Sequence, residues 1–150
     1  MTQDPVDLEP EYWRKKKLSD MSHMEWERLC DGCGKCCLHK IRGEGDAVKA
    51  TDIACRLLDT NSCLCTNYPQ RKKLVPDCVV LSPEWLEIID WLPRSCAYRL
   101  VNNGQDLPHW HPLVNGDPES VHRAGASVRG RCISERNAGP FHTHVVPWNF

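Results

Sequence analysis

The feature that most constrains this chain is a block of four cysteines within eight residues. It reads Cys30-Asp31-Gly32-Cys33-Gly34-Lys35-Cys36-Cys37, so that the Cys-x-x-Cys spacing occurs twice. A Cys-x-x-Cys turn directs both sulfurs toward one tetrahedral ion at about 2.3 Å, and glycine lets the backbone between them turn sharply. We therefore expect residues 30–37 to form a tight chelating loop rather than a helix.

The number of cysteines indicates more than one ion. Neighbours on a chain tend to point apart, so Cys36 and Cys37 are not expected to be simple terminal ligands of the same ion. One tetrahedral site needs four thiolates and two sites need eight, or fewer when sulfurs are shared. Nine cysteines are the candidate ligands of a polynuclear site: Cys30, Cys33, Cys36, Cys37, Cys55, Cys63, Cys65, Cys78 and Cys96. The tenth, Cys132, stands apart and is expected to be a free or packed thiol.

The N-terminal sequence bears on whether the thiols bind metal or form disulfides, because disulfides persist mainly in oxidising compartments. Residues 1–10 are acidic and contain two prolines, without the basic start and apolar run of a secretory signal peptide. No stretch approaches the roughly 18 apolar residues that span a bilayer. We expect a soluble, cytoplasmic protein with reduced thiols, and a disulfide framework remains the less favoured alternative.

Charge and motifs narrow the function classes. A formal net charge of −1 gives no electrostatic reason to expect nucleic-acid or membrane binding, and the basic runs at residues 14–17 and 71–73 fit solvated faces. The G-x-S-x-G nucleophile, P-loop and G-x-G-x-x-G motifs are all missing, so the sequence offers no positive evidence for an enzyme. The expected partners are metal ions, and no protein partner can be named.

Length and composition predict a small, loop-rich α+β fold whose short helices and brief strands are organised around a cysteine–metal cluster. A chain of 150 residues fits one domain, but only 41% of its residues are hydrophobic even with cysteine counted. Metal binding would then supplement a thin core. We expect a flexible arm at residues 1–21, a metal-binding domain at 22–134 and a divergent tail at 135–150.

Local patterns place the elements. Ser22 and Glu25 form a capping-box pattern, which predicts a helix over residues 23–29 that leads into Cys30. Residues 47–58 predict a strand followed by a turn. Further expectations are a helix over 82–92 capped by Ser82, a helix over 94–101 closed by Asn102-Asn103-Gly104, and a brief strand within 126–134.

The sequence neighbours of the other polar and aromatic residues indicate their expected roles. His39 follows the cysteine block closely and is either a ligand or a donor to the ligands. The alternating pairs His109/His111 and His142/His144 are expected to be surface or hydrogen-bonded core residues. Asp31, Asp52 and Asp77 adjoin cysteines, Lys35, Lys40 and Arg71 are placed to offset thiolate charge, and the six tryptophans are expected to cover the thiols as core residues.

These residues resemble the CxxCxxCC family of zinc- or iron-chelating proteins, and specifically its YcgN-like branch of bacterial cysteine-cluster proteins. The resemblance spans about residues 22 to 130, and the order and spacing of nine cysteines carry it. Its motifs are EWERLCDGCGKCCLHK at 25–40, ACR at 54–56, Cys63-x-Cys65, PDC at 76–78, WLP at 91–93, CAYRL at 96–100, DLP at 106–108 and WHPL at 110–113. Cys132 and residues 142–144 fall outside the pattern.

The resemblance implies metal chelation by zinc or iron and no settled biochemical activity. Zinc, with two or more ions, is the favoured cofactor, because Cys-x-x-Cys turns are common in zinc sites. An iron or iron–sulfur protein, acting in redox chemistry or as part of a modification enzyme, is the first alternative. Handling of copper(I), which soft thiolates also bind, is the second.

Overall fold

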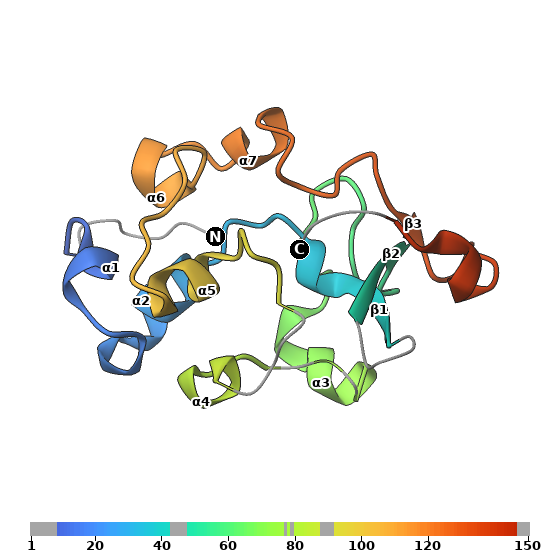
Figure 1. The fold of residues 1–150 in the computed structure, drawn as a ribbon, viewed down its shortest axis with the longest axis horizontal. Coiled ribbons are helices and arrows are strands. Elements are labelled where there is room, and N and C mark those ends of the chain that lie inside the picture. Colours follow the sequence, from blue (N-terminus) through green and yellow to red (C-terminus); the bar gives the residue numbers. More distant parts are fainter. Residues whose placement is uncertain (1–8, 43–47, 77, 79, 88–91, 147–150) are drawn as a thin grey trace.

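The computed structural model describes residues 9–42, 48–76, 78, 80–87 and 92–146 and is a mixed, loop-rich α+β fold, as predicted (Figure 1). Its α-helices have four to six residues. They are α1 (Tyr12–Lys15), α2 (His23–Arg28), α3 (Arg71–Leu74), α4 (Pro83–Leu86), α5 (Ala97–Asn102), α6 (Pro112–Asn115) and α7 (Ser120–Arg123). Short 3₁₀ turns are η2 (Leu18–Asp20), η3 (Lys35–Cys37), η5 (Tyr68–Gln70) and η6 (Phe141–His144).

One small sheet lies at the end of the molecule opposite α1, α2 and α5 (Figure 1). It has the order β1-β2-β3, with β1 at Leu38–Arg42, β2 at Val48–Ala54 and β3 at Ile133–Ser134. Strands β1 and β2 are antiparallel with an irregularity between Leu38 and Lys40, whereas β2 and β3 are parallel. The strand expected within residues 47–58 is therefore confirmed as β2, and the strand expected within 126–134 is reduced to two residues.

Two apolar clusters form the core, and the cysteine block connects them. The first cluster, beneath the helices, consists of Tyr12, Trp13, Leu18, Leu29, Ala97, Tyr98 and Leu107. The second, beside the sheet, consists of Leu38, Ala54, Leu58, Cys63 and Val128. Leu29 and Leu38 are 0% and 2% exposed, and burying such a side chain contributes roughly 1.5–3 kcal/mol. Residues 30–37 are thus anchored at both ends.

The N-terminal segment differs from the expected flexible arm. Tyr12, Trp13 and Leu18 are buried in the first cluster, and aromatic side chains of this kind bury 150–250 Å² each. The Tyr12 hydroxyl donates to the Glu25 carbonyl at 2.7 Å, and Trp13 Nε1 donates to Asp106 Oδ1 at 3.0 Å. Residues 12–20 accordingly pack as part of the fold, because their aromatic burial outweighs the basic character of the surrounding sequence.

The helix that leads into the cysteine block forms as predicted. Helix α2 begins after Ser22, whose hydroxyl accepts from the Glu25 amide at 3.2 Å. The Glu25 carboxylate in turn accepts from the Ser22 amide at 2.8 Å, which completes the capping box. Lys16 also donates to that carboxylate at 2.9 Å, so the buried charge of Glu25 is paired.

The later helices are only partly as expected. The helix predicted over residues 82–92 is present as the four-residue helix α4, and residues 88–91 lie outside the described part. Ser82 precedes α4, but its side chain does not cap the helix as predicted. Trp85 is 45% exposed, so the expectation of buried tryptophans is wrong there. Helix α5 starts three residues later than predicted but closes as expected, with Gly104 at φ +74°. Among the described residues, no helix is both long and apolar enough to cross a membrane.

Candidate metal centre

The first cysteine turn is shaped by left-handed glycines and one buried carboxylate. Gly32 and Gly34 both have φ +78°, a conformation that costs other residues roughly 1–2 kcal/mol. Asp31 is 7% exposed, and its Oδ1 accepts from the Cys33 amide at 3.1 Å. A Cβ atom on Gly34 would lie 2.8 Å from Val128 Cγ2, so the turn packs too closely for any side chain there. The predicted tight loop over 30–37 is confirmed, ending in η3.

The charge of Cys36 acts on several other thiols. Loss of water around the sulfur and the charge of Cys36 together raise the pKa of each of Cys30, Cys33, Cys78 and Cys96. For Cys33 the charge of Asp31 adds to this effect. The outermost of these thiols, Cys30 and Cys96, are 66 residues apart in the sequence, so the fold brings distant segments within range of each other's charges.

The adjacent residues Cys36 and Cys37 interact directly, contrary to our expectation that their side chains point apart. A hydrogen bond from the Cys37 thiol lowers the pKa of Cys36 to about 7, and the same bond raises the pKa of Cys37. Both residues lie in the 3₁₀ turn η3. The charges of Cys55 and Cys65 also act on Cys37 and Cys78.

Charge interactions connect eight of the nine predicted ligands, and we refer to these eight residues as the eight-thiol group. Its members are Cys30, Cys33, Cys36, Cys37, Cys55, Cys65, Cys78 and Cys96. All ten cysteines of the chain lie in the described part and carry free thiols. Within the described residues, no group of three or more histidine, cysteine, aspartate or glutamate side chains is arranged to hold a metal ion.

Cations lie beside the eight-thiol group, as the sequence predicted. Lys40 Nζ donates to the carbonyls of Lys35 and Leu38 at 2.6 and 2.7 Å. Desolvation lowers the pKa of Lys40 to about 8, against the opposite pull of Cys36, Cys37 and Cys33. The charge of Arg71 lowers the pKa of Cys78, although desolvation has the larger, raising effect. Both cations are positioned to offset thiolate charge.

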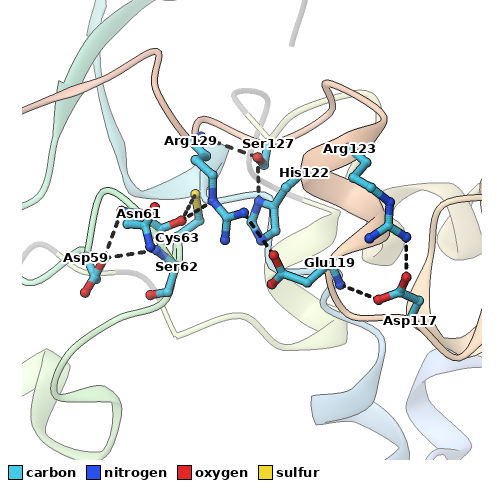
Figure 2. Close-up of polar contacts among 10 residues, drawn as sticks. All are labelled: Asp59, Asn61, Ser62, Cys63, Asp117, Glu119, His122, Arg123, Ser127 and Arg129. Atoms are coloured by element: carbon cyan, nitrogen blue, oxygen red, sulfur yellow. Dashed lines mark hydrogen bonds and ion pairs between the residues drawn. The ribbon is translucent and has the colours of Figure 1, made fainter.

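The ninth predicted ligand, Cys63, lies in a different environment (Figure 2). Its backbone is left-handed with φ +63°, its side chain is buried, and its sulfur is 4.0 Å from the Asn61 carbonyl. Desolvation raises the pKa of Cys63, and the Ser127 side chain acts in the opposite direction. His122 Nδ1 lies 2.7 Å from the Ser127 hydroxyl. The nearby thiol is Cys132, whose pKa is raised by desolvation and then by the charge of Cys63. Cys132 packs against the second cluster, which fits the expected packed thiol.

The histidines have partners other than sulfur. His39 Nε2 pairs with the Glu135 carboxylate, and His144 Nδ1 lies 2.8 Å from Asp52 Oδ1. His111 is 0% exposed and is a hydrogen-bonded core residue, as expected. Of the carboxylates expected near the thiols, Asp31 is at the first turn, Asp52 faces His144, and Asp77 lies outside the described residues.

Two contacts that bear on the site were not anticipated from the sequence. Trp110 Nε1 donates to Asp31 Oδ2 at 3.3 Å, and His111 Nε2 donates to the Leu29 carbonyl at 2.6 Å. Both contacts reach the first cysteine turn from about 80 residues away in the sequence. The sequence signals were the alternating histidine pair that includes His111 and the WHPL motif, and neither indicates what the two side chains contact.

Comparison with known proteins places the chain in a class of thiol-rich proteins. Residues 29–97 match the CxxCxxCC domain, described as "Putative zinc- or iron-chelating domain". The UPF0260 protein of Granulibacter bethesdensis is 58% identical over 138 residues, which are 91% of this chain and 83% of that protein. No solved structure matches the chain.

Two further relatives extend this similarity over nearly the whole chain. The UPF0260 protein of Gluconacetobacter diazotrophicus is 58% identical over 140 residues, covering 93% of this chain and 88% of its own. The UPF0260 protein of Allorhizobium ampelinum is 51% identical over 151 residues, covering 99% of this chain and 91% of its own. The chain therefore belongs to the UPF0260 family, and the resemblance to CxxCxxCC proteins inferred from its motifs is confirmed.

Proposed function

We propose that this protein chelates metal ions through the eight-thiol group, with zinc as the favoured ion. The observation that carries the proposal is the reach of the Cys36 charge, which acts on thiols from three segments of the chain, at Cys30 and Cys33, at Cys78 and at Cys96. Eight thiolates match the requirement of two tetrahedral zinc sites. The match to a domain described as zinc- or iron-chelating supports the same conclusion.

The arrangement of charges suits a bound cation. Eight thiolates around two Zn²⁺ ions carry a formal charge of −4, which is costly to bury without nearby cations and N–H donors. Lys40 and Arg71 supply positive charge at two edges of the group. Cys30 and Cys36 are exposed residues, which places this part of the group at the protein surface.

Metal binding requires the thiols to move closer together than they lie in the described structure. The cysteine block is anchored by Leu29 and Leu38 but contains two glycines, so its interior has freedom to contract around an ion. Binding also requires thiol deprotonation, which the raised pKa values of most of the group oppose in the absence of metal. We infer that zinc binding and local ordering of this block are coupled.

Cys63 is left out of the proposed ligand set, because its sulfur lies against Asn61 and Ser127. We propose a cytoplasmic location, consistent with ten free thiols, and a binding rather than catalytic role. An iron or iron–sulfur centre is the second candidate, favoured by the inclusion of iron in the description of the matched domain.

The test is elemental analysis of untagged protein purified anaerobically, with a visible spectrum of the same sample. The proposal predicts about two zinc ions per chain and no colour. Iron with visible absorption would select the iron alternative, and several tightly bound copper(I) ions would select copper handling. Less than about half a metal ion per chain would contradict chelation altogether, because structural thiolate sites bind tightly.

A further inference from the structure

We propose that His111, assisted by Trp110, is a positioning residue that holds the first cysteine turn in the shape that presents Cys30 and Cys33. This inference rests on the proposed chelation and concerns how that site is built. Neither residue is a ligand in the proposal. The evidence is a set of hydrogen bonds that reach both flanks of Cys30 from one distant dipeptide.

The first contact fixes the residue before Cys30. The carbonyl of Leu29 accepts a hydrogen bond from His111 Nε2 at 2.6 Å, and both residues are 0% exposed. His111 Nδ1 accepts from the Leu113 amide at 3.0 Å, so Nδ1 carries no proton and Nε2 must be the donor. The tautomer is thereby determined, and the imidazole links the start of α6 to the entrance of the cysteine turn.

The second contact fixes the residue after Cys30. Trp110 Nε1 donates to Asp31 Oδ2 at 3.3 Å, while Asp31 Oδ1 accepts from the Cys33 amide at 3.1 Å. The carboxylate therefore joins the indole to the turn. Two successive residues of one segment hold the positions on either side of the first thiol.

A third contact relates this turn to Cys96. The Tyr98 hydroxyl donates to the Trp26 carbonyl at 2.8 Å, close to the end of α2. Because Tyr98 is two residues after Cys96 at the start of α5, this bond relates the position of Cys96 to helix α2, which ends just before Cys30. The same carbonyl also accepts from the Leu29 amide at 3.2 Å, so the Tyr98 hydroxyl is a second donor at the end of α2.

Removing the imidazole donor leaves the Leu29 carbonyl buried without its hydrogen bond, which favours rearrangement of the turn. Changes to residues that orient metal ligands typically weaken metal binding by roughly 10- to 100-fold. We expect His111 variants to fall near the lower end of this range, because the sulfurs themselves are unchanged.

Two variants of the full chain separate positioning from a merely structural role. In His111→Asn, the amide oxygen can replace Nδ1 as the acceptor for the Leu113 amide, but no donor reaches Leu29. In His111→Gln, the longer side chain can place its amide nitrogen where the imidazole Nε2 lies in the wild type and so restore the donor to the Leu29 carbonyl. This variant loses the acceptor for the Leu113 amide at the start of α6. If His111 acts only by capping α6, the Asn variant should resemble the wild type more closely than the Gln variant does. If His111 positions the turn at Cys30, the Gln variant should resemble the wild type more closely.

Affinity for Zn²⁺, measured by competition with a chelator, should fall about 10-fold in His111→Asn and stay within about twofold of wild type in His111→Gln. Amide hydrogen exchange of residues 30–34 in the metal-free protein should accelerate only in the Asn variant. Equal behaviour of the two variants in both measurements, or a smaller effect in Asn, would overturn the proposal.

The two measurements also distinguish this inference from the proposed function. If wild-type protein fails to bind Zn²⁺ while the exchange difference between Asn and Gln persists, chelation of zinc is wrong and the positioning of the turn stands. If zinc binds tightly and equally to all three proteins, chelation stands and the positioning role is wrong.

Discussion

The eight-thiol group and the Cys63–Cys132 pair place the same side chain in two contrasting environments. In the first, sulfurs from distant segments act on one another and lie near Lys40 and Arg71. In the second, Cys63 is enclosed by Asn61, Ser127 and Arg129 in a polar network (Figure 2). This contrast is the reason for leaving Cys63 out of the ligand set that we propose.

The separation of Cys63 from Cys65 has a local cause. The Asp59 carboxylate accepts from the amides of Asn61 and Ser62 at 2.8 and 3.0 Å, and Leu58 pairs with Cys65 in an antiparallel bridge. This closes a tight turn in which Cys63 takes a left-handed conformation. Cys65 can then act on Cys37 and Cys78, while Cys63 packs in the second cluster.

The largest expected difference between the two regions is in metal affinity. Cys36→Ser should weaken Zn²⁺ binding by more than the roughly 10- to 100-fold typical of residues that only orient ligands, because Cys36 is proposed to contact the ions. Cys132→Ser is the matched control and should leave both affinity and stoichiometry unchanged. Chelator competition on metal-free protein measures both; equal affinities for the two variants would remove the distinction between the regions.

The next effect concerns Gly34, which lies where the two regions touch. Gly34→Ala adds a Cβ 2.8 Å from Val128 Cγ2 and 3.1 Å from Cys63 Cβ, at φ +78°. Backbone strain of roughly 1–2 kcal/mol and overpacking of about 1–3 kcal/mol should both lower the free energy of unfolding. Gly116→Ala, at φ +76° with no atom within 4 Å, should show only the strain. Urea denaturation of the metal-free proteins measures the free energy of unfolding of both variants. Equal losses of this free energy in Gly34→Ala and Gly116→Ala would argue against close packing at Gly34.

A smaller effect should appear at Cys63 itself. Cys63→Ala removes a buried thiol and should lower the free energy of unfolding by about 1 kcal/mol, with zinc stoichiometry unchanged. Cys63→Gly should be less destabilising than Ala, because glycine adopts φ +63° without strain. Thermal unfolding and elemental analysis test these statements; loss of one zinc ion from either variant would return Cys63 to the ligand set.

The smallest effect is on the pH dependence of stability, through His111 on the helical side of the cysteine block. Burial lowers the pKa of His111 below its ordinary value near 6.5, against smaller raising effects of the Leu29 carbonyl and the charge of Asp31. The unfolded chain therefore binds the proton first as pH falls. The stabilising contribution of the neutral imidazole is complete above about pH 6.5 and declines as pH falls from there toward the lower folded pKa.

Urea denaturation of metal-free wild type and His111→Gln at pH 7.5 and 5.5 isolates this contribution. Wild type should lose more stability between the two pH values than the variant, which lacks the titrating group. A larger loss in the variant would mean that the buried imidazole is not held neutral.

The sequence anticipated elements whose determinants are local. The capping box of Ser22 and Glu25 predicted α2, and Gly32 and Gly34 predicted the tight turn, because both depend on residues within a few positions of one another. It did not reveal that Tyr12 and Trp13 pack into the first cluster, since their burial depends on contacts such as Trp13 with Asp106, 93 residues away.

The candidate site was anticipated to a similar extent. The spacing of cysteines identified candidate ligands, and Lys40 was correctly expected beside them. The contact between the Cys36 and Cys37 thiols was not anticipated, because the spacing of the residues does not indicate the 3₁₀ turn η3 in which both lie. The roles of Trp110 and His111 depend on a tertiary contact to the first cysteine turn, which spacing cannot show.

The most direct test of the central claim is X-ray absorption at the zinc edge of the zinc-loaded protein, in wild type and Cys63→Ser. The account predicts a first shell of about four sulfur atoms at about 2.3 Å per zinc, identical in the two proteins. A shell with nitrogen or oxygen ligands, or a shell that loses sulfur in Cys63→Ser, would contradict chelation by the eight-thiol group.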